Sequence, residues 1–334
     1  MRLPKVKYLF QSRALVLMYH RINTPDSDPW NLSVSPEKFE KHLKVLKNNF
    51  SVVSTDELVR QLNAKKIRNR SVAITFDDGY LDNFITAKPI LEKYSIPATF
   101  FITDSYLGNY QSFWWDQLEN IIVHTEQLPS FFSINFQDNV IQFTLGDEAV
   151  LNDKLRTQHL NYKASKPPTL RTELYLKLWK IFSPLSKEKQ TQLLQLIRNW
   201  AGLTENDIKV NGCMSVQQLK QLADNPLFTI GGHTKSHLSL TDHGKYVQER
   251  EILENQEFLE THLKTKLDHF AYPSGNYNES TVQLLKASSF SSGFTTTPQN
   301  LTQQHTNIYK IGRFQVNNQN GDTFSRTLLK WLKS

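Results

Sequence analysis

Apolar residues occur along the chain either in short continuous runs or at the spacing of a helix turn. These two patterns predict alternating strands and helices toward both ends of the chain. Short apolar runs predict strands at 14–19, 51–53, 72–76, 98–102, 228–231, 268–272, 292–296 and 309–316. Apolar positions with the helical period predict helices near 215–223, 246–263 and 279–287. Ser35 and Pro36 are typical of a helix start, and Ser54 with Glu57 form a capping-box pattern before a second helix. Seven or eight strands with intervening helices predict an α/β fold, a distorted or incomplete (β/α) barrel.

The long stretch between Thr103 and Ser215 interrupts this alternation. Its sequence predicts a helix at 114–118, a hairpin at 131–144 around Asp138-Asn139, and two amphipathic helices within 170–200 that are divided at Ser183-Pro184. An insertion after a barrel strand emerges on the active-site face, so we expect this segment to help shape a substrate groove.

Composition and charge restrict the class of protein. A hydrophobic content of 39% can fill a core, and the single cysteine, Cys213, excludes an internal disulfide. The net charge of +7 favours an acidic glycan or an anionic membrane face as partner. The densest basic run, 65–70, is too short to indicate nucleic acid. Residues 1–22 lack an uninterrupted apolar signal region, and no apolar run is long enough to span a membrane. We therefore expect a cytoplasmic protein, with peripheral membrane contact left open.

One predicted strand ends in two carboxylates and a glycine. Asp77, Asp78 and Gly79 directly follow the apolar run 72–76. Carboxyl ends of strands are where α/β folds place their chemistry. Because successive strand side chains point to opposite sides, one acid can bind a metal while the other stays free as a base. Taken alone, an Asp-Asp-Gly tripeptide is more often a surface turn.

A second apolar run, 228–231, leads to His233 and His237. Histidines at i and i+4 share one face if the backbone turns helically, and with one carboxylate they can clamp a single ion. Such a set leaves coordination positions open for water and substrate, as a hydrolytic metal centre requires. Histidines at this spacing are, taken alone, more often packed or solvated. The hypothesis of a metal site therefore depends on the aspartate segment and the histidine segment together.

Four segments occur in an order that is typical of one enzyme family. They are TFDDGY (75–80), PATFF (97–101), GGHTKSH (231–237) and FAYPSG (270–275). The chain resembles the polysaccharide deacetylases, the NodB-homology or carbohydrate esterase family 4 group, over 14–103 and 215–316. The resemblance implies a catalytic barrel formed by 1–103 and 215–334, an insertion at 104–214, and metal-dependent removal of N- or O-acetyl groups from a sugar.

The resemblance also implies roles for individual residues. Asp77 matches the catalytic base, and the metal ligands match Asp78, His233 and His237. Tyr272, followed by Pro273, falls where the family uses a backbone N–H for the oxyanion. In the implied chemistry water attacks the acetyl carbonyl, Asp77 accepts its proton, and a general acid protonates the leaving group.

The identity of the general acid is less direct. No late Leu-x-His motif is convincing, whereas His20 ends the apolar run 15–19. This arrangement resembles the subgroup with permuted motif order, in which an N-terminal Tyr-His supplies the acid. The alternative is that His20 only packs near the barrel mouth. Arg313, at the end of a late strand, matches an arginine that orients the base in the family, although a surface salt bridge is equally open.

Three aromatic residues are candidate substrate contacts: Tyr80, Trp114 and Trp115. Phe113, Trp114 and Trp115 could stack on sugar rings, but aromatics at the start of a helix more often belong to the core.

Three classes of function remain open. The first is a metal-dependent hydrolase that removes acetyl groups, expected to be N-acetyl, from a polysaccharide, an oligosaccharide or a lipid-linked sugar. The second is an amidohydrolase of the same fold acting on a small non-sugar C–N bond, and the third is an inactive carbohydrate-binding protein. Two imidazoles with one carboxylate suit Zn²⁺, but also Co²⁺, Ni²⁺ or Fe²⁺.

Overall fold

The computed structural model describes residues 12–108, 112–160, 162–208, 212–304 and 306–334. These residues form two compact units. The first, which we call the sheet unit, contains the described residues up to Thr24, then Leu32–Leu107 and Met214–Ser334. The second, which we call the insertion unit, contains Pro25–Asn31 and the described residues of Gly108–Cys213. The short segment Pro25–Asn31 thus belongs with residues far from it in the sequence.

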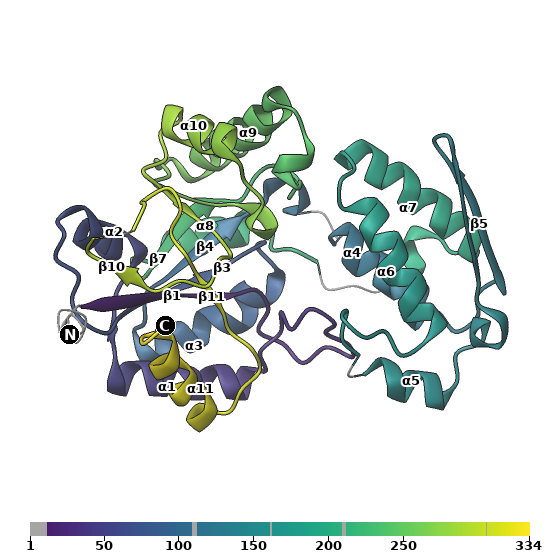
Figure 1. The fold of residues 1–334 in the computed structure, drawn as a ribbon, viewed down its shortest axis with the longest axis horizontal. Coiled ribbons are helices and arrows are strands. Elements are labelled where there is room, and N and C mark those ends of the chain that lie inside the picture. Colours follow the sequence, from purple (N-terminus) through teal and green to yellow (C-terminus); the bar gives the residue numbers. More distant parts are fainter. Residues whose placement is uncertain (1–11, 109–111, 161, 209–211, 305) are drawn as a thin grey trace, which may run out of the picture. The chain divides into compact units, whose positions relative to one another are not determined.

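The sheet unit is built on a mostly parallel sheet (Figure 1). Its main strands lie in the order β1 (Arg13–Tyr19), β3 (Ser71–Phe76), β4 (Ala98–Ile102), β7 (Phe228–Gly232), β8 (His269–Ala271) and β9 (Ser292–Phe294). Three two-residue strands complete it: β2 (Ser51–Val52) beside β3, and both β10 (Leu301–Thr302) and β11 (Phe314–Gln315) beside β1. Among the described strands of this sheet, β10 alone runs antiparallel to its neighbour. Neighbouring parallel strands therefore follow chain order, as they do in a (β/α) barrel.

The last strands bring the two ends of this sheet together. Phe294 of β9 forms a parallel bridge with Ile311, and Phe314 of β11 pairs with Leu17 of β1. The segment 311–315 therefore spans the gap between the first and last main strands. The predicted distorted barrel is confirmed, but its late strand is far shorter than the predicted 309–316 because the chain only bridges β9 and β1 there.

Helices of the sheet unit follow the strands. They are α1 (Pro36–Asn49), α2 (Thr55–Asn63), α3 (Lys88–Tyr94), α8 (Val216–Ala223), α9 (Lys245–Leu263), α10 (Glu279–Ala287) and α11 (Gly321–Trp331). Figure 1 shows α1, α3 and α11 on one side of the sheet, and α9 contacts both α8 and α10. Leu15 and Leu17 of β1 pack with helix residues such as Phe39, whereas Val16 packs with Phe101 in a second core inside the curved sheet. This alternation follows from the strand period of two.

Helix starts follow the predicted caps in part. The Ser35 hydroxyl accepts a hydrogen bond from the Lys38 N–H at the start of α1, and Pro36 is the first helical residue. Ser54 accepts from the Glu57 N–H at the start of α2. The predicted reciprocal bond of a capping box is absent there in the described structure, because the Glu57 side chain accepts instead from Gln61 one turn later, at 2.8 Å.

The insertion unit has its own core. Its elements are α4 (Trp114–Glu119), β5 (Phe131–Phe136), β6 (Asn139–Thr144), α5 (Asp153–His159), α6 (Leu170–Phe182) and α7 (Lys187–Ala201). The predicted hairpin and the divided helix pair are confirmed. Pro25–Asn31 joins this unit through Trp30, whose ring lies 4.8 Å from that of Trp179, and Ser27, which donates to Glu119 at 2.7 Å. A role for the insertion in a substrate groove stays a prediction.

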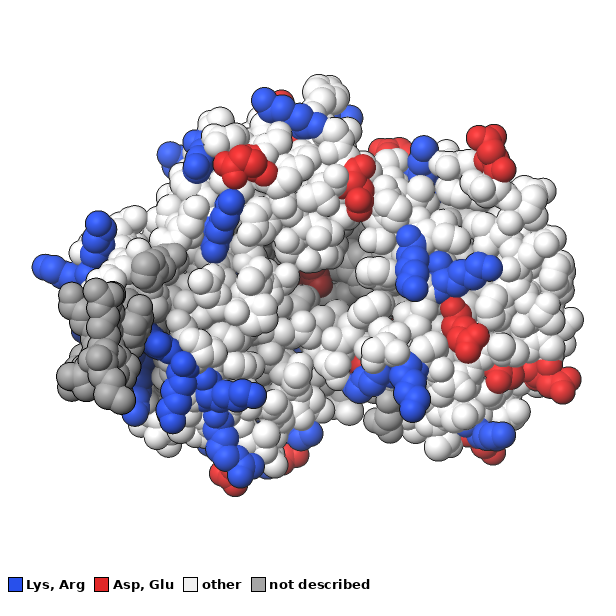
Figure 2. Space-filling view, viewed as in Figure 1, with Lys and Arg blue, Asp and Glu red and all other residues white. Residues whose placement is uncertain are grey.

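Many of the basic side chains on the surface have an acidic neighbour. Lys41 and Lys44 of α1, for example, pair with Glu37 and Glu40 at 2.6 and 3.8 Å. Figure 2 shows Lys and Arg side chains on both units with acidic side chains among them. Within the described residues, no helix combines the length and hydrophobicity that crossing a bilayer requires.

Candidate metal centre

Asp77 and Asp78 lie directly after the last residue of β3, where the backbone changes direction sharply. Asp78 and Gly79 both have left-handed φ values, 78° and 83°. Such a φ is unfavourable for a residue with a Cβ, although Asp tolerates it better than most. The turn places the Asp77 and Asp78 side chains in different surroundings, so that the two acids have different partners.

His233 and His237 lie in the loop after β7 (Phe228–Gly232). The backbone does not turn helically between them, because Thr234 and His237 adopt left-handed φ values of 63° and 57°. The two rings converge nevertheless, with centroids 5.0 Å apart and planes at 71°. A non-helical loop thus brings two histidines together that a helix would have placed on one face.

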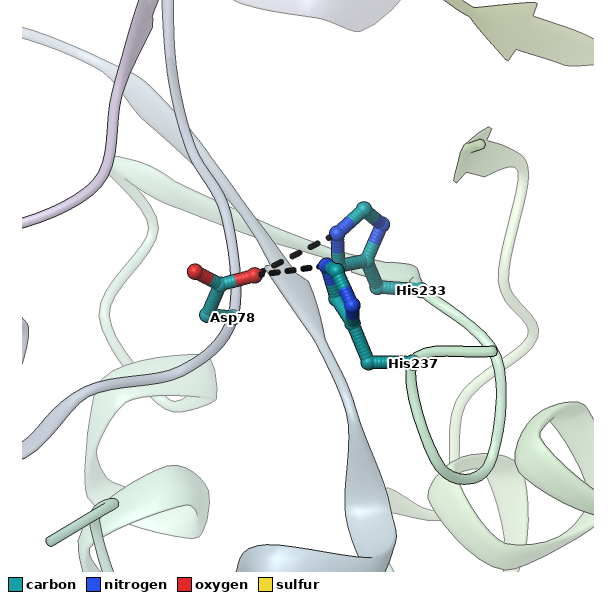
Figure 3. A group of neighbouring side chains, drawn as sticks. All are labelled: Asp78, His233 and His237. Carbon is teal, nitrogen blue, oxygen red and sulfur yellow. Dashed lines mark ion pairs between the residues drawn. The ribbon is translucent and has the colours of Figure 1, made fainter. Parts of the chain in front are cut away.

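Asp78, His233 and His237 form a compact cluster (Figure 3). Asp78 Oδ1 lies 3.4 Å from His233 Nε2 and 3.3 Å from His237 Nε2. One ligand atom from each residue can be chosen so that all three lie within 4.8 Å of one another. Burial raises the pKa of Asp78, but the two imidazoles beside it outweigh burial and hold that pKa well below its usual range.

Two observations indicate that this cluster fits a cation. His233 Nδ1 lies 2.8 Å from the Ala271 carbonyl oxygen, which can only accept, so Nδ1 carries a proton and Nε2 is the nitrogen whose lone pair can be presented to a metal. That lone pair faces Asp78 Oδ1, a buried atom that has no hydrogen-bond partner among the described residues. Two acceptors at this distance need a positive charge between them, and two imidazoles with one carboxylate are a typical zinc donor set.

Asp77 forms a buried pair with Arg313. The Arg313 guanidinium donates from Nη1 to Asp77 Oδ1 at 2.6 Å and from Nη2 to Oδ2 at 2.7 Å. It also donates to Thr75 Oγ1 at 3.2 Å and to the Thr295 carbonyl at 3.0 Å. Arg313 is 0% exposed and Asp77 2%, which excludes the surface salt bridge that the sequence left open. Burial is the largest influence and raises the pKa of Asp77, but the charge and hydrogen bonds of Arg313, together with His233 and His20, lower that pKa below its usual value.

His20 lies at the end of β1, beside these groups. The Asn83 side chain donates to the His20 carbonyl at 2.7 Å, and Asp82 Oδ1 accepts from the Ile22 N–H at 3.1 Å. Among the described residues, His20 Nδ1 is a buried atom without a hydrogen-bond partner. Burial lowers the pKa of His20, although the nearby charges of Asp78 and Asp77 act in the opposite direction. The structure therefore brings this imidazole close enough to both acids for their charges to act on it.

The prediction that the Tyr272 N–H binds the oxyanion is wrong. The Tyr272 N–H donates to the Phe294 carbonyl at 3.0 Å, as part of the pairing between β8 and β9, so it is not available to a substrate. Pro273, the next residue, has no N–H. Ser274 follows, with an exposed side chain and a left-handed φ of 53°. Its N–H is the first after the backbone hydrogen bonds that pair β8 with β9.

Two of the three candidate substrate contacts are also wrong, because they belong to the interior. Tyr80 is 1% exposed and its ring lies under the Arg21 guanidinium, 4.4 Å from the ring centroid. Trp114 is 6% exposed and stacks on Phe182 at 4.9 Å in the insertion-unit core. Trp115 is partly buried in the same core, and its role stays a prediction.

Sequence reasoning missed the residues that support the histidine loop. Asn255 and Glu251 of α9 are buried and hydrogen-bond to residues 233–236. Their only sequence signal is indirect: both are polar residues on the side of a predicted helix that turned out to face the protein interior.

Comparison with known proteins agrees with this architecture. A family model described as polysaccharide deacetylase matches residues 64–172 and 178–292, which is more than half of the chain. YxkH of Bacillus subtilis (strain 168) is 35% identical over 117 residues, covering 34% of this chain and 40% of the relative. A poly-β-1,6-N-acetyl-D-glucosamine N-deacetylase of Staphylococcus aureus (strain MSSA476) is also 35% identical over 117 residues, covering 31% and 40%. The match thus spans 40% of the length of these relatives.

Two experimental structures share the fold. The Streptococcus pyogenes deacetylase PplD, determined with acetate, aligns with a TM-score of 0.58 at 18% identity, over 97% of this chain and 100% of PplD. IcaB from Ammonifex degensii aligns with a TM-score of 0.57 at 18% identity, over 97% and 98%. Together with the family match, the curved parallel sheet and the motif residues at its strand ends lead to one conclusion: the chain belongs to the polysaccharide deacetylase family.

Proposed function

We propose that this protein is a metal-dependent hydrolase that removes N-acetyl groups from a glucosamine-containing polysaccharide or oligosaccharide. The observation that carries the proposal is the three-residue cluster of Asp78, His233 and His237, with the buried Asp77–Arg313 pair beside it. The similarity to a poly-β-1,6-N-acetyl-D-glucosamine N-deacetylase supports the choice of sugar.

The cluster would hold one divalent cation, and we propose Zn²⁺, although Co²⁺, Ni²⁺ and Fe²⁺ suit the same donors. When bound, such a cation supplies a Lewis acid that polarises the acetyl carbonyl and lowers the pKa of water. The division between the acids follows from their partners. Asp78 faces the imidazoles, whereas Asp77 faces Arg313 and remains available to accept a proton.

The remaining groups of the site would act on the acyl transfer itself. Arg313 keeps Asp77 ionised at neutral pH, because it lowers the pKa of that carboxyl. We assign to Asp77 the role of accepting the proton of the attacking water, and to the protonated form of His20, which the charges of Asp77 and Asp78 favour, that of protonating the leaving amine. The Ser274 N–H is our replacement for Tyr272 as the backbone donor to the oxyanion.

The test is acetate release from N-acetylated β-1,6-linked glucosamine oligomers, measured with zinc-loaded and chelator-treated protein. We expect release that depends on zinc and disappears in His233→Ala, which loses a metal ligand. His262→Ala is the matched control, since this imidazole on α9 bonds to the Phe258 carbonyl and lies outside the cluster.

A second variant separates metal binding from proton transfer. Asp77→Asn should still bind zinc but lose turnover. If the wild-type protein binds zinc and releases no acetate from these oligomers, the proposed substrate is wrong; if it binds no zinc, the metal assignment is wrong.

A further inference from the structure

The histidine loop is held in a strained conformation. Two of its residues, Thr234 and His237, have left-handed φ values of 63° and 57°. Non-glycine residues in such regions cost about 1–3 kcal/mol each and persist only where the surroundings over-determine them. The loop contributes one bond itself, from the His237 N–H to Thr234 Oγ1 at 3.0 Å, and Thr103 donates to the His233 carbonyl at 2.9 Å.

Further restraints come from the end of β4, the loop after it, and β8. The His233 N–H also donates to the Ile102 carbonyl at 3.1 Å, and the Ser105 N–H donates to the Lys235 carbonyl at 2.9 Å. His233 Nδ1 bonds to the Ala271 carbonyl at 2.8 Å. One helix, α9, adds side-chain bonds beside both histidines.

Asn255 of α9 bonds directly to the first histidine. Its Oδ1 accepts from the His233 N–H at 3.1 Å, while its Nδ2 donates to the Ile102 carbonyl at 3.1 Å and to Asp104 Oδ1 at 2.6 Å. Because the Ile102 carbonyl can only accept, the amide has one orientation, with its oxygen toward His233. Asn255 is fully buried, so water does not compete for these bonds.

A glycine makes this approach possible. A Cβ at Gly232, the residue before His233, would lie 2.8 Å from Asn255 Oδ1 and 2.9 Å from the Phe290 ring. The second glycine of the motif therefore leaves room for the helix side chain that bonds to the histidine backbone.

Glu251, one turn earlier on α9, holds the middle of the loop. Its carboxylate accepts from the Ser236 N–H at 2.8 Å and from the Ser236 hydroxyl at 2.6 Å, and its own carbonyl accepts from the Lys235 N–H at 2.9 Å. Ser236 directly precedes His237. Glu251 and Asn255 thus bind the backbone beside both histidines from a single rigid helix.

We propose that Asn255 and Glu251 are positioning residues that pre-organise His233 and His237 for metal binding. The proposal rests on the metal site of the proposed function. Without these bonds the loop can relax out of its strained conformation, and the two Nε2 atoms no longer face Asp78 together. Replacement of groups that orient metal ligands typically weakens metal affinity by about 10–100-fold.

The experiment measures the dissociation constant of Zn²⁺ for chelator-stripped protein by competition with a chromophoric chelator. Asn255→Ala and Glu251→Ala should each weaken zinc binding by about 10–100-fold. Gln248→Ala is the matched control, because this buried amide of α9 bonds to the His243 carbonyl and Thr281 rather than to the loop. It should lower the melting temperature of the metal-free protein but leave zinc affinity within about twofold.

Two further readouts distinguish positioning from general stability. Ser236→Ala removes only the hydroxyl bond to Glu251, so it should stay folded and weaken zinc binding less than Glu251→Ala. With Co²⁺ in place of zinc, the visible absorption bands should shift in Asn255→Ala and Glu251→Ala but not in Gln248→Ala, because the bands report ligand geometry.

The outcomes separate the two claims. Wild-type protein without zinc affinity would refute the metal site of the proposed function. Wild-type affinity and unchanged Co²⁺ spectra in Asn255→Ala and Glu251→Ala would refute the positioning role alone. If these two variants are unfolded without metal, an affinity of Ser236→Ala equal to wild type would refute it as well.

Discussion

Replacement of Arg313 by Gln tests the most strongly coupled pair in the site. The change removes the only guanidinium that donates to both oxygens of Asp77, at 2.6 and 2.7 Å within the described structure. Both side chains are buried, so solvent cannot replace the lost charge. The amide of glutamine can donate at most one or two neutral hydrogen bonds. Asp77 would then be a buried carboxylate with no compensating cation in contact.

Breaking a buried ion pair in this way typically costs about 3–5 kcal/mol of unfolding free energy. The sign of the pH dependence follows from burial. In the wild type Arg313 holds the pKa of Asp77 below its usual value, so the ion pair stabilises the fold at neutral pH and is lost only in acid. In Arg313→Gln, burial is the largest influence on this carboxyl and is opposed by the smaller effects of His233 and His20, so its pKa should rise. The variant should therefore lose most stability at pH 7 and lie closest to the wild type near pH 4, where the carboxyl is neutral.

The assay is urea unfolding of metal-free wild-type and variant protein between pH 4 and 7.5. The pH-dependent difference between them isolates Asp77, because the other titrating groups are common to both. Arg313→Lys is the matched control: it keeps a charge but loses the two-pronged geometry, and should fall between the two. In a double-mutant cycle, Asp77→Asn should remove much of the penalty of Arg313→Gln. A stability difference that does not vary with pH, or no coupling in the cycle, would refute this account.

Three other predictions concern single side chains. His20→Gln should lower kcat/KM by about 10²–10⁴-fold, the usual loss of a general acid; unchanged kinetics would return His20 to a packing role. Tyr272→Phe removes a hydrogen bond of 2.9 Å from the hydroxyl to the Tyr309 carbonyl, so unfolding free energy should fall by about 1 kcal/mol while kcat is unchanged, and a large loss of kcat would indicate a catalytic role for that hydroxyl. Burial lowers the pKa of His42 to about 4, so the wild type should lose stability as pH falls from 6.5 to 4. His42→Gln should flatten that slope by up to about 1.4 kcal/mol per pH unit, and equal slopes by urea unfolding would contradict the assignment.

The parts of this protein that the sequence predicted are those encoded by local pattern. Short continuous apolar runs placed the main strands, and apolar positions with helical spacing placed α8, α9 and α10. The pairing of Asp78 with His233 and His237 was also predictable, because acids and histidines that follow parallel strands converge at one end of a sheet. What pattern could not supply was backbone conformation: the histidine loop is strained rather than helical, since bonds from α9 and Thr103 over-determine it.

The errors arose where one residue type has two common environments. An aromatic side chain can stack on a sugar or fill a core, and only the surrounding fold decides. Trp114 meets Phe182 and Trp179 across more than sixty residues of sequence. Tyr272 failed for a related reason. Its N–H was assigned from motif position, but β9, which lies later in the chain, takes that N–H into the sheet.

The closure of the barrel and the orientation of the proposed base depend on the same short segment. Ile311 bridges to Phe294 and Phe314 pairs with Leu17, so Arg313 lies between two fixed attachment points. Gly312 allows the chain to pass there, since a Cβ would lie 2.7 Å from the Thr297 carbonyl and 2.7 Å from the Gln299 side chain. Because both neighbours of Arg313 are fixed, its guanidinium reaches Asp77 with little loss of side-chain freedom. The two-residue strand β11 adds few hydrogen bonds to the sheet, but it fixes the backbone directly after Arg313. The buried guanidinium is thereby held against the carboxylate of Asp77, 236 positions earlier in the chain.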